Sequence, residues 1–214
     1  MGILLDFVGR LLTRGWQRFV WLLSSRRTLR GVKTAVFAGD ATACFDKIDQ
    51  ALQLIERNDQ VTLGLMREQF GGLLVFGKEG FRAAYWSRSG RLCVLTESYV
   101  QSPTLTPALL ALTLVHEAMH ARLALAGVQY TDGRRAPIEV LCAMAELAFA
   151  RRLEDVALAQ TAERCINDWS TGGEARWSNK TVRQDTLAYL RELGTPGWIV
   201  SIVDQLSRFL KRAA

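Results

Sequence analysis

The sequence predicts a predominantly helical α+β protein with a small antiparallel sheet placed directly before one long helix. Most of the chain shows helical periodicity with capping residues at the expected ends. Three short apolar runs rich in β-forming residues lie close together between residues 73 and 95. With 214 residues, of which 49% are hydrophobic, the chain is long enough to bury a core of ordinary size.

The segments before the long helix have clear boundaries. We expect a helix over residues 41–57 with Asp40 as its cap, and a second over residues 61–70 that ends at Gly71 and Gly72. The expected strands are residues 73–76, 81–86 and 91–95, and residues 87–90 form a hairpin turn between the last two. After the central segments we expect helices over residues 155–167, 182–193 and 198–211.

The long helix covers residues 105–126 and carries both histidines of the chain. Thr106 suits its N-cap and Pro107 its first helical position. The histidines, His116 and His120, are four residues apart, and Glu117 follows the first directly. Because residues i and i+4 share one face of a helix, both imidazoles can reach one metal ion.

This H-E-x-x-H pattern has the residue types that a catalytic zinc ion needs. Neutral imidazole is a good zinc ligand. Glu117 points about 100° away around the helix, so it suits a hydrogen bond to a zinc-bound water better than direct coordination. A zinc-bound water loses its proton near neutral pH, and the carboxylate would take that proton as the water attacks a peptide carbonyl. The alternative is a chance pattern, with two histidines packed in a core.

A third ligand is expected from the next helix, over residues 136–150. Its only charged residues are Glu139 and Glu146, which are seven residues apart and share a face. Carboxylates in such an apolar segment are rare unless they are paired or bound to metal. A reversal at Gly127 and at Asp132-Gly133 would make the two helices antiparallel. Either glutamate can be the ligand, and Glu146 can also be solvated.

H-E-x-x-H followed by a helix-borne glutamate resembles the gluzincin branch of the zinc metallopeptidases, over residues 105–153. The resemblance implies a zincin-like core, a Zn²⁺ cofactor and a polypeptide substrate. It makes His116, His120 and Glu139 the zinc ligands, Glu117 the general base, and Glu146 a carboxylate that holds one histidine in its tautomer. The chain is shorter than the aminopeptidases of that clan, and it lacks their G-x-M-E-N element and the metzincin extension after His120.

Two further features of a peptidase can be placed on the sequence. Negative charge develops on the carbonyl oxygen during hydrolysis, so a hydrogen-bond donor is expected near the zinc. Tyr130, Arg134 and Arg135 lie between the two ligand helices, and we favour Tyr130 for this role. An edge strand, either residues 81–86 or 91–95, can pair with an extended substrate. A simple packing hairpin is the alternative.

The net charge of +6 arises from residues 1–33, which we treat as a basic helical arm preceding a single domain over residues 34–214. The remainder is neutral, which argues against a nucleic-acid partner. Asp6, Arg10, Arg14 and Arg18 form one polar stripe on an otherwise apolar helix. This helix either lies on an anionic membrane or packs against the domain or a partner. Its uncharged runs are too short to span a bilayer, and it is a poor signal peptide.

Four widely spaced cysteines without a C-x-x-C pair indicate reduced thiols and a cytoplasmic protein, which can be peripheral on the inner face of a membrane. The leading function is a zinc-dependent hydrolase acting on polypeptides. A zinc-binding protein without catalysis, serving regulation or membrane association, is the second hypothesis. A metal-free helical membrane adaptor is the third.

Overall fold

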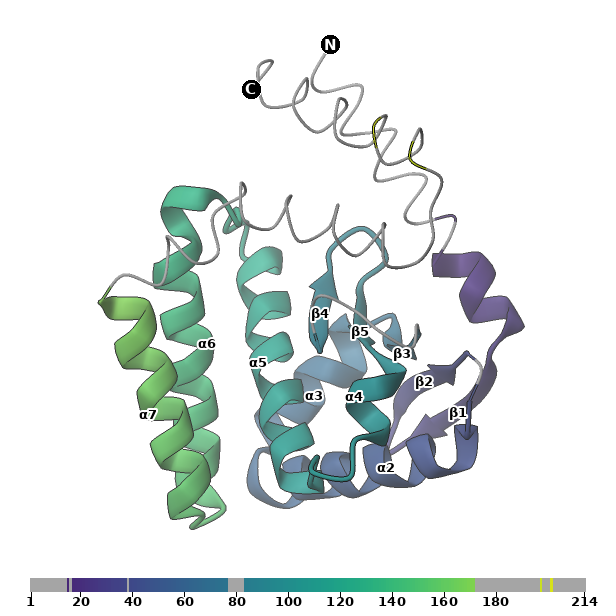
Figure 1. The fold of residues 1–214 in the computed structure, drawn as a ribbon, viewed down its shortest axis with the longest axis horizontal. Coiled ribbons are helices and arrows are strands. Elements are labelled where there is room, and N and C mark those ends of the chain that lie inside the picture. The colour runs from purple at the N-terminus through teal and green to yellow at the C-terminus, as the bar shows by residue number, and fades with distance from the viewer. Residues whose placement is uncertain are drawn as a thin grey trace.

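Helices make up most of the described chain and pack around one five-stranded sheet (Figure 1). The computed structural model describes residues 15, 17–37, 39–76, 83–171, 197 and 201. The prediction of a predominantly helical α+β protein is therefore confirmed. The helices expected over residues 182–193 and 198–211, and most of the expected N-terminal helix, lie outside the described residues.

The sheet is mixed, with the strand order β1-β2-β3-β5-β4. Its strands are β1 (Ser25–Leu29), β2 (Val32–Val36), β3 (Gly72–Val75), β4 (Ala84–Ser87) and β5 (Leu92–Leu95). The three central strands run parallel, while β1 and β4 are antiparallel to their neighbours at the two edges. Every residue of β3 and β5 is buried, as expected for parallel strands that are covered on both faces.

The expectation of a small antiparallel sheet was right only for the hairpin of β4 and β5. β3 pairs in parallel with β5, because β4 turns back along the outer side of β5 and leaves β3 as the inner neighbour of β5. β1 and β2 were not expected, since residues 25–33 were assigned to the basic arm. The first four residues of β1 are exposed, so this edge strand lacks the apolar alternation that identifies strands in a sequence.

Six helices follow β2 in the described chain, and four of them begin at a residue whose side chain caps the helix. The six are α2 (Ala41–Asn58), α3 (Gln60–Gln69), α4 (Glu97–Gln101), α5 (Pro107–Leu125), α6 (Asp132–Arg152) and α7 (Val156–Ser170). Asp40 accepts a hydrogen bond from the amide of Ala43, and Thr106 accepts one from the amide of Leu109. Asp155 caps α7 in the same way. The predicted start of α5 at Pro107 is therefore confirmed.

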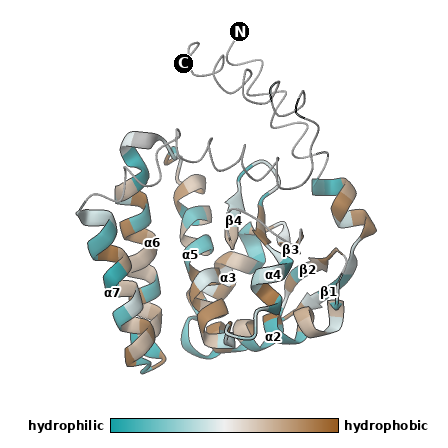
Figure 2. Cartoon of the chain, in the orientation of Figure 1, coloured by the Kyte–Doolittle hydropathy of each residue, from teal (hydrophilic) through white to brown (hydrophobic). Residues whose placement is uncertain are grey.

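The main core lies between the sheet and α2, α3 and α5, and a smaller apolar cluster covers the opposite face of the sheet. Hydrophobic and hydrophilic residues alternate along α7 (Figure 2), which is the pattern of a helix with one exposed face. Among the described helices, α5 is the one long and apolar enough to cross a membrane by length and composition. It packs against α2 and α6 in this core, which accounts for its apolar character.

The helices α5 and α6 lie side by side and run antiparallel (Figure 1). The chain reverses at Gly127, whose φ of 82° suits glycine. The other predicted turn was wrong, because Asp132 and Gly133 already belong to the first turn of α6. Pro137 consequently lies inside the helix rather than at its start, and Glu139 is further from the helix terminus than expected.

Candidate metal centre

His116 and His120 lie next to each other on α5, on the side that faces α6. Their ring centroids are 4.8 Å apart with an interplanar angle of 62°. Their Nε2 atoms are separated by 3.1 Å. The four-residue spacing thus turns one nitrogen of each imidazole toward the same point between the helices.

Glu139 approaches that point from α6. Its Oε2 lies 3.1 Å from the Nε2 of His116, and its Oε1 lies 3.5 Å from the Nε2 of His120. Donor atoms bound 2.0–2.1 Å from a tetrahedral zinc ion lie about 3.3–3.4 Å from one another. The contacts between Glu139 and the two imidazoles therefore have the spacing of three ligands around one ion.

Glu146 contacts the opposite nitrogen of His116. Its Oε1 lies 2.8 Å from Nδ1, so a proton on Nδ1 is donated to Glu146 and the lone pair of Nε2 is left for the centre. A carboxylate on the outer nitrogen fixes the tautomer and ring orientation of a metal-binding histidine. The two glutamates of α6 are thus both at the predicted face, and they contact different nitrogens of His116.

The structure adds Cys142, one of the four cysteines, which was not expected as a ligand. His116, His120 and Cys142 each offer one ligand atom, these atoms lie within 4.8 Å of one another, and the group can hold a metal ion. Burial raises the pKa of the Cys142 thiol far above its usual value, and the neighbouring carboxylates raise it further. Its position three residues after Glu139 was the sequence signal for this second donor on the same helix face.

The carboxylates at the centre favour a positive charge between them. Burial alone would lower the pKa of His116, but the contacts with Glu139 and Glu146 outweigh it and raise the pKa to about 10. Burial would raise the pKa of Glu139, but its contacts with His116 and His120 hold that pKa well below the usual value. Two carboxylates around two imidazoles thus favour a bound positive charge, either a proton on His116 or a metal ion shared by the ligands.

Glu117 is a buried carboxylate beside this group. Only 5% of the residue is exposed, and its Oε2 has no hydrogen-bond partner among the described residues. The backbone N–H of Trp86 in β4 donates to the same carboxylate. Burial raises the pKa of Glu117, and the nearby imidazoles oppose this rise in part. The carboxylate of Glu117 is therefore anchored to β4, while its Oε2 is buried without a hydrogen-bond partner among the described residues.

The centre opens into a cavity of about 490 Å³. Its described lining includes the five imidazole and carboxylate side chains described above (His116, Glu117, His120, Glu139 and Glu146), residues 83–86 and 88 around β4, and apolar residues of α5 and α6. Of the two strands considered for this role, β4 lines the cavity and β5 contributes no described lining residue. Glu117 is among the lining residues, so the cavity reaches the carboxylate that the sequence analysis assigned as the base.

Tyr130 lies at the rim of the cavity, close to the centre. Its hydroxyl donates a hydrogen bond to Oε1 of Glu139, and its ring meets the His120 ring edge-on with centroids 5.6 Å apart. The guanidinium of Arg135 lies 5.3 Å from the centroid of the Tyr130 ring. Arg134, the third residue considered with them, is exposed. Tyr130 thus directly contacts two candidate ligands, Glu139 and His120.

Comparison with known proteins gives no match to a protein-family model, to a curated protein or to a solved structure. The function is therefore argued from the geometry of the centre.

We predict that the purified chain holds a tightly bound divalent cation and that His116→Ala and His120→Ala each abolish this binding. Glu146→Gln should weaken it roughly 10- to 100-fold, because the outer carboxylate only orients His116. Competition titration with a chromogenic chelator measures all three. Glu163→Gln, at an exposed carboxylate on α7, is the control and should bind as wild type does. Histidine variants that retain full metal content would contradict the assignment.

Proposed function

We propose that the chain is a zinc-dependent metallohydrolase of the gluzincin type, a peptidase with a zincin-like core. The observation that supports this most is the position of Glu117. A buried carboxylate with an unpartnered oxygen lies beside two imidazoles and a third ligand candidate, at the wall of a cavity. Three protein ligands with a neighbouring base are the pattern of catalytic zinc sites.

The donor set fits zinc. Two imidazole nitrogens and a carboxylate oxygen are ligands that zinc accepts in tetrahedral geometry with one position left for solvent or substrate. His116, His120 and Glu139 would hold the ion, with Glu146 orienting His116. When bound, zinc would supply Lewis-acid chemistry, polarising a carbonyl and making water more acidic.

Glu117 would carry the proton in the reaction. The attacking water forms a C–O bond with the peptide carbonyl carbon and loses a proton to Oε2 of Glu117. When the C–N bond breaks, the same carboxyl gives that proton to the leaving amine. The raised pKa of Glu117 suits both steps, since a base whose pKa is closer to neutral also serves well as the acid.

Tyr130 would stabilise the charge that develops on the carbonyl oxygen. Its hydroxyl lies at the cavity rim and donates to Glu139. A small rotation of the side chain would redirect that O–H from the carboxylate to a substrate oxygen. A donor that acts mainly in the transition state lowers the barrier without tightening substrate binding.

The position of β4 at the edge of the sheet supports an extended polypeptide as the substrate. The amide of Thr96 donates to the carbonyl of Ala83, so in this antiparallel ladder the backbone groups of Ala84 and Trp86 point away from β5. The N–H of Trp86 reaches Glu117. The backbone of Ala84 therefore lies next to the base along the same edge, where it can pair with a peptide and align the scissile bond.

A zinc-binding protein without catalysis is the second candidate, and Cys142 is the observation that favours it. If Cys142 binds together with both histidines and Glu139, all four positions of a tetrahedral ion are filled by protein. Such a closed site would staple α5 to α6 and leave no position for a substrate.

Single variants of α6 distinguish these two ligand sets. We expect Glu139→Ala to lose zinc at concentrations where Cys142→Ala keeps it, because the carboxylate lies within 3.5 Å of both Nε2 atoms while the buried thiol resists ionisation. Zinc content after dialysis against a weak chelator measures the difference. Loss of zinc from Cys142→Ala, with Glu139→Ala unaffected, would favour the closed site.

Glu117→Gln should keep zinc and lose turnover by roughly 10²- to 10⁴-fold, the usual contribution of a general base. The assay is cleavage of unfolded casein by the zinc-loaded protein, followed by mass spectrometry of the fragments. Equal zinc content in the variant excludes a ligand defect. A variant as active as wild type, or a zinc-loaded wild type that cleaves nothing, would contradict the peptidase proposal.

Tyr130→Phe should reduce kcat roughly 10²-fold with little change in KM, because the lost O–H would act on the transition state. The ring and its contact with His120 remain in phenylalanine, so zinc content should be unchanged. Steady-state kinetics on a peptide recovered from the casein digest gives both constants. A rise in KM alone would instead assign Tyr130 to substrate binding.

A further inference from the structure

Residues 17–23 form a helix with an apolar face turned outward. Phe19, Leu22 and Leu23 are 53%, 66% and 59% exposed. The opposite face carries Gln17, Val20 and Trp21 and packs on the sheet. A helix on the surface of a globular domain normally turns its large apolar residues toward the core and polar residues outward. Here the outward face is apolar as well.

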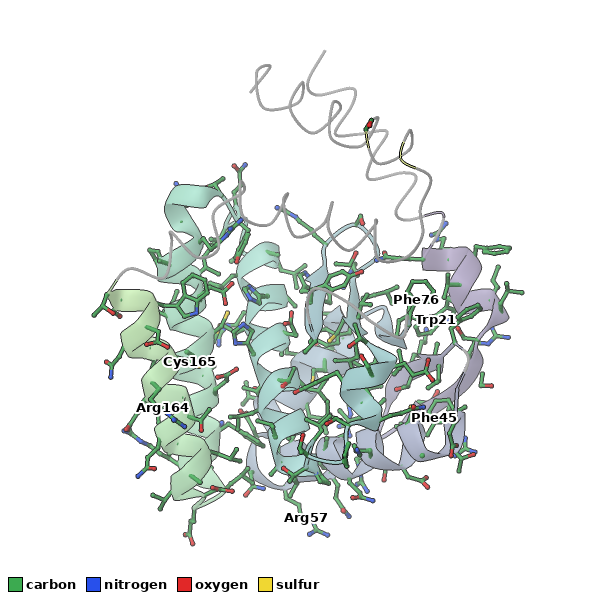
Figure 3. The ribbon with its side chains drawn as sticks, viewed as in Figure 1. Trp21, Phe45, Arg57, Phe76, Arg164 and Cys165 are labelled. Carbon is green, nitrogen blue, oxygen red and sulfur yellow. The ribbon has the colours of Figure 1, made fainter. Side chains whose placement is uncertain are left out.

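The inward face fixes the helix in this orientation. Gln17 and Ser87 of β4 are both buried, and their side chains exchange two hydrogen bonds of 2.9 and 3.0 Å. Val20 is buried against β2, β3 and β5, and Trp21 packs on the same cluster together with Phe76 (Figure 3). A side chain at Gly72 would collide with the Trp21 ring. The outward apolar face therefore cannot be buried by rotating the helix.

Exposed basic side chains lie on this helix and on the sheet face that carries it. Arg18 is exposed on the helix itself, and Arg26 and Lys33 are exposed on β1 and β2. Arg26 pairs with Ala35, which packs against Val20, and Lys33 lies two residues before Ala35 on the same strand. Arg26 and Lys33 thus lie on the sheet face that carries the helix. Residues 17–37 contain no acidic side chain.

We propose that Phe19, Leu22 and Leu23, with Arg18, Arg26 and Lys33, form a docking surface for an anionic lipid bilayer. The apolar side chains would enter the boundary of the acyl chains, and the cations would meet the negative headgroups. Each cation near such a surface strengthens binding roughly fivefold. Three partly exposed side chains offer much less area than the roughly 800 Å² per partner of a stable protein interface, so lipid fits this surface better than a second copy.

Docking would also orient the cavity. The helix bonds to Ser87, and the residues on either side, Trp86 and Arg88, line the cavity. A bilayer held at the helix would therefore keep the β4 rim at a fixed orientation to the membrane, where polypeptide segments close to the lipid would reach it. This consequence rests on the proposed function, whereas docking itself does not.

The test is co-sedimentation of the full-length protein with vesicles of phosphatidylcholine alone or with phosphatidylserine added. We expect binding that needs phosphatidylserine and that falls at least tenfold in the variant Phe19→Ser/Leu22→Ser/Leu23→Ser. The matched control is Val61→Ser/Val156→Ser, since these apolar residues are 79% and 69% exposed elsewhere on the surface. It should bind as wild type does.

A second variant keeps the test decisive if the first one folds poorly. Arg18→Glu/Arg26→Glu/Lys33→Glu should lose binding to phosphatidylserine vesicles, and salt should weaken the wild type in the same direction. The proposal would be overturned if the wild type does not bind vesicles. It would also be overturned if the triple serine variant binds as well as the Val61→Ser/Val156→Ser control. The proposal would also be overturned if light scattering shows that the wild type is a dimer and the triple serine variant a monomer, while the wild type binds no vesicles. None of these readouts depends on peptidase activity.

Discussion

Two imidazoles and two carboxylates meet where α5 packs against α6, in surroundings that are otherwise apolar. The rest of the fold brings these four side chains together. The sheet and α2 bury the apolar side of α5, which leaves the His116 and His120 side for α6. The short reversal at Gly127 then brings Glu139 and Glu146 opposite them. Such a group is stable only when a positive charge balances it, so the packing of the two helices is coupled to a proton on His116 or to a metal ion that the group can hold.

Much of this pair could be predicted because the relevant rules are local. Thr106 and Pro107 determine where α5 begins, and four-residue spacing determines that His116 and His120 share a face. The seven-residue spacing of Glu139 and Glu146 placed both on the face toward α5, as observed. Which nitrogen each glutamate would contact was not predictable from spacing alone, because it depends on how far α6 is shifted along α5. That shift is set by tertiary packing.

The unpredicted features are those that depend on partners distant in sequence. β1 and β2 form because residues 25–29 pair with residues 32–36 at the edge of a sheet whose centre lies more than thirty residues later. The charged, exposed side chains of β1 resemble a basic arm when read alone. The parallel pairing of β3 with β5 likewise follows from a crossing of the chain and not from local pattern. Cys142 was overlooked because a thiol in an apolar helix usually serves packing, and only its distance from both histidines marks it as a donor.

Glu117 is difficult to explain by stability alone. Its neighbours toward the core, Leu114, Ala118 and Ala121, are buried apolar residues, and a similar residue at position 117 would pack there without desolvating a carboxylate. A buried acceptor without a partner costs about 1–3 kcal/mol, and more when it is charged. A site that only stapled α5 to α6 would need the histidines and a third ligand but not this cost. Glu117 lines the cavity beside the centre, and a role as the base of the proposed hydrolysis would account for this cost, so this one carboxylate supports that proposal more strongly than the ligands do.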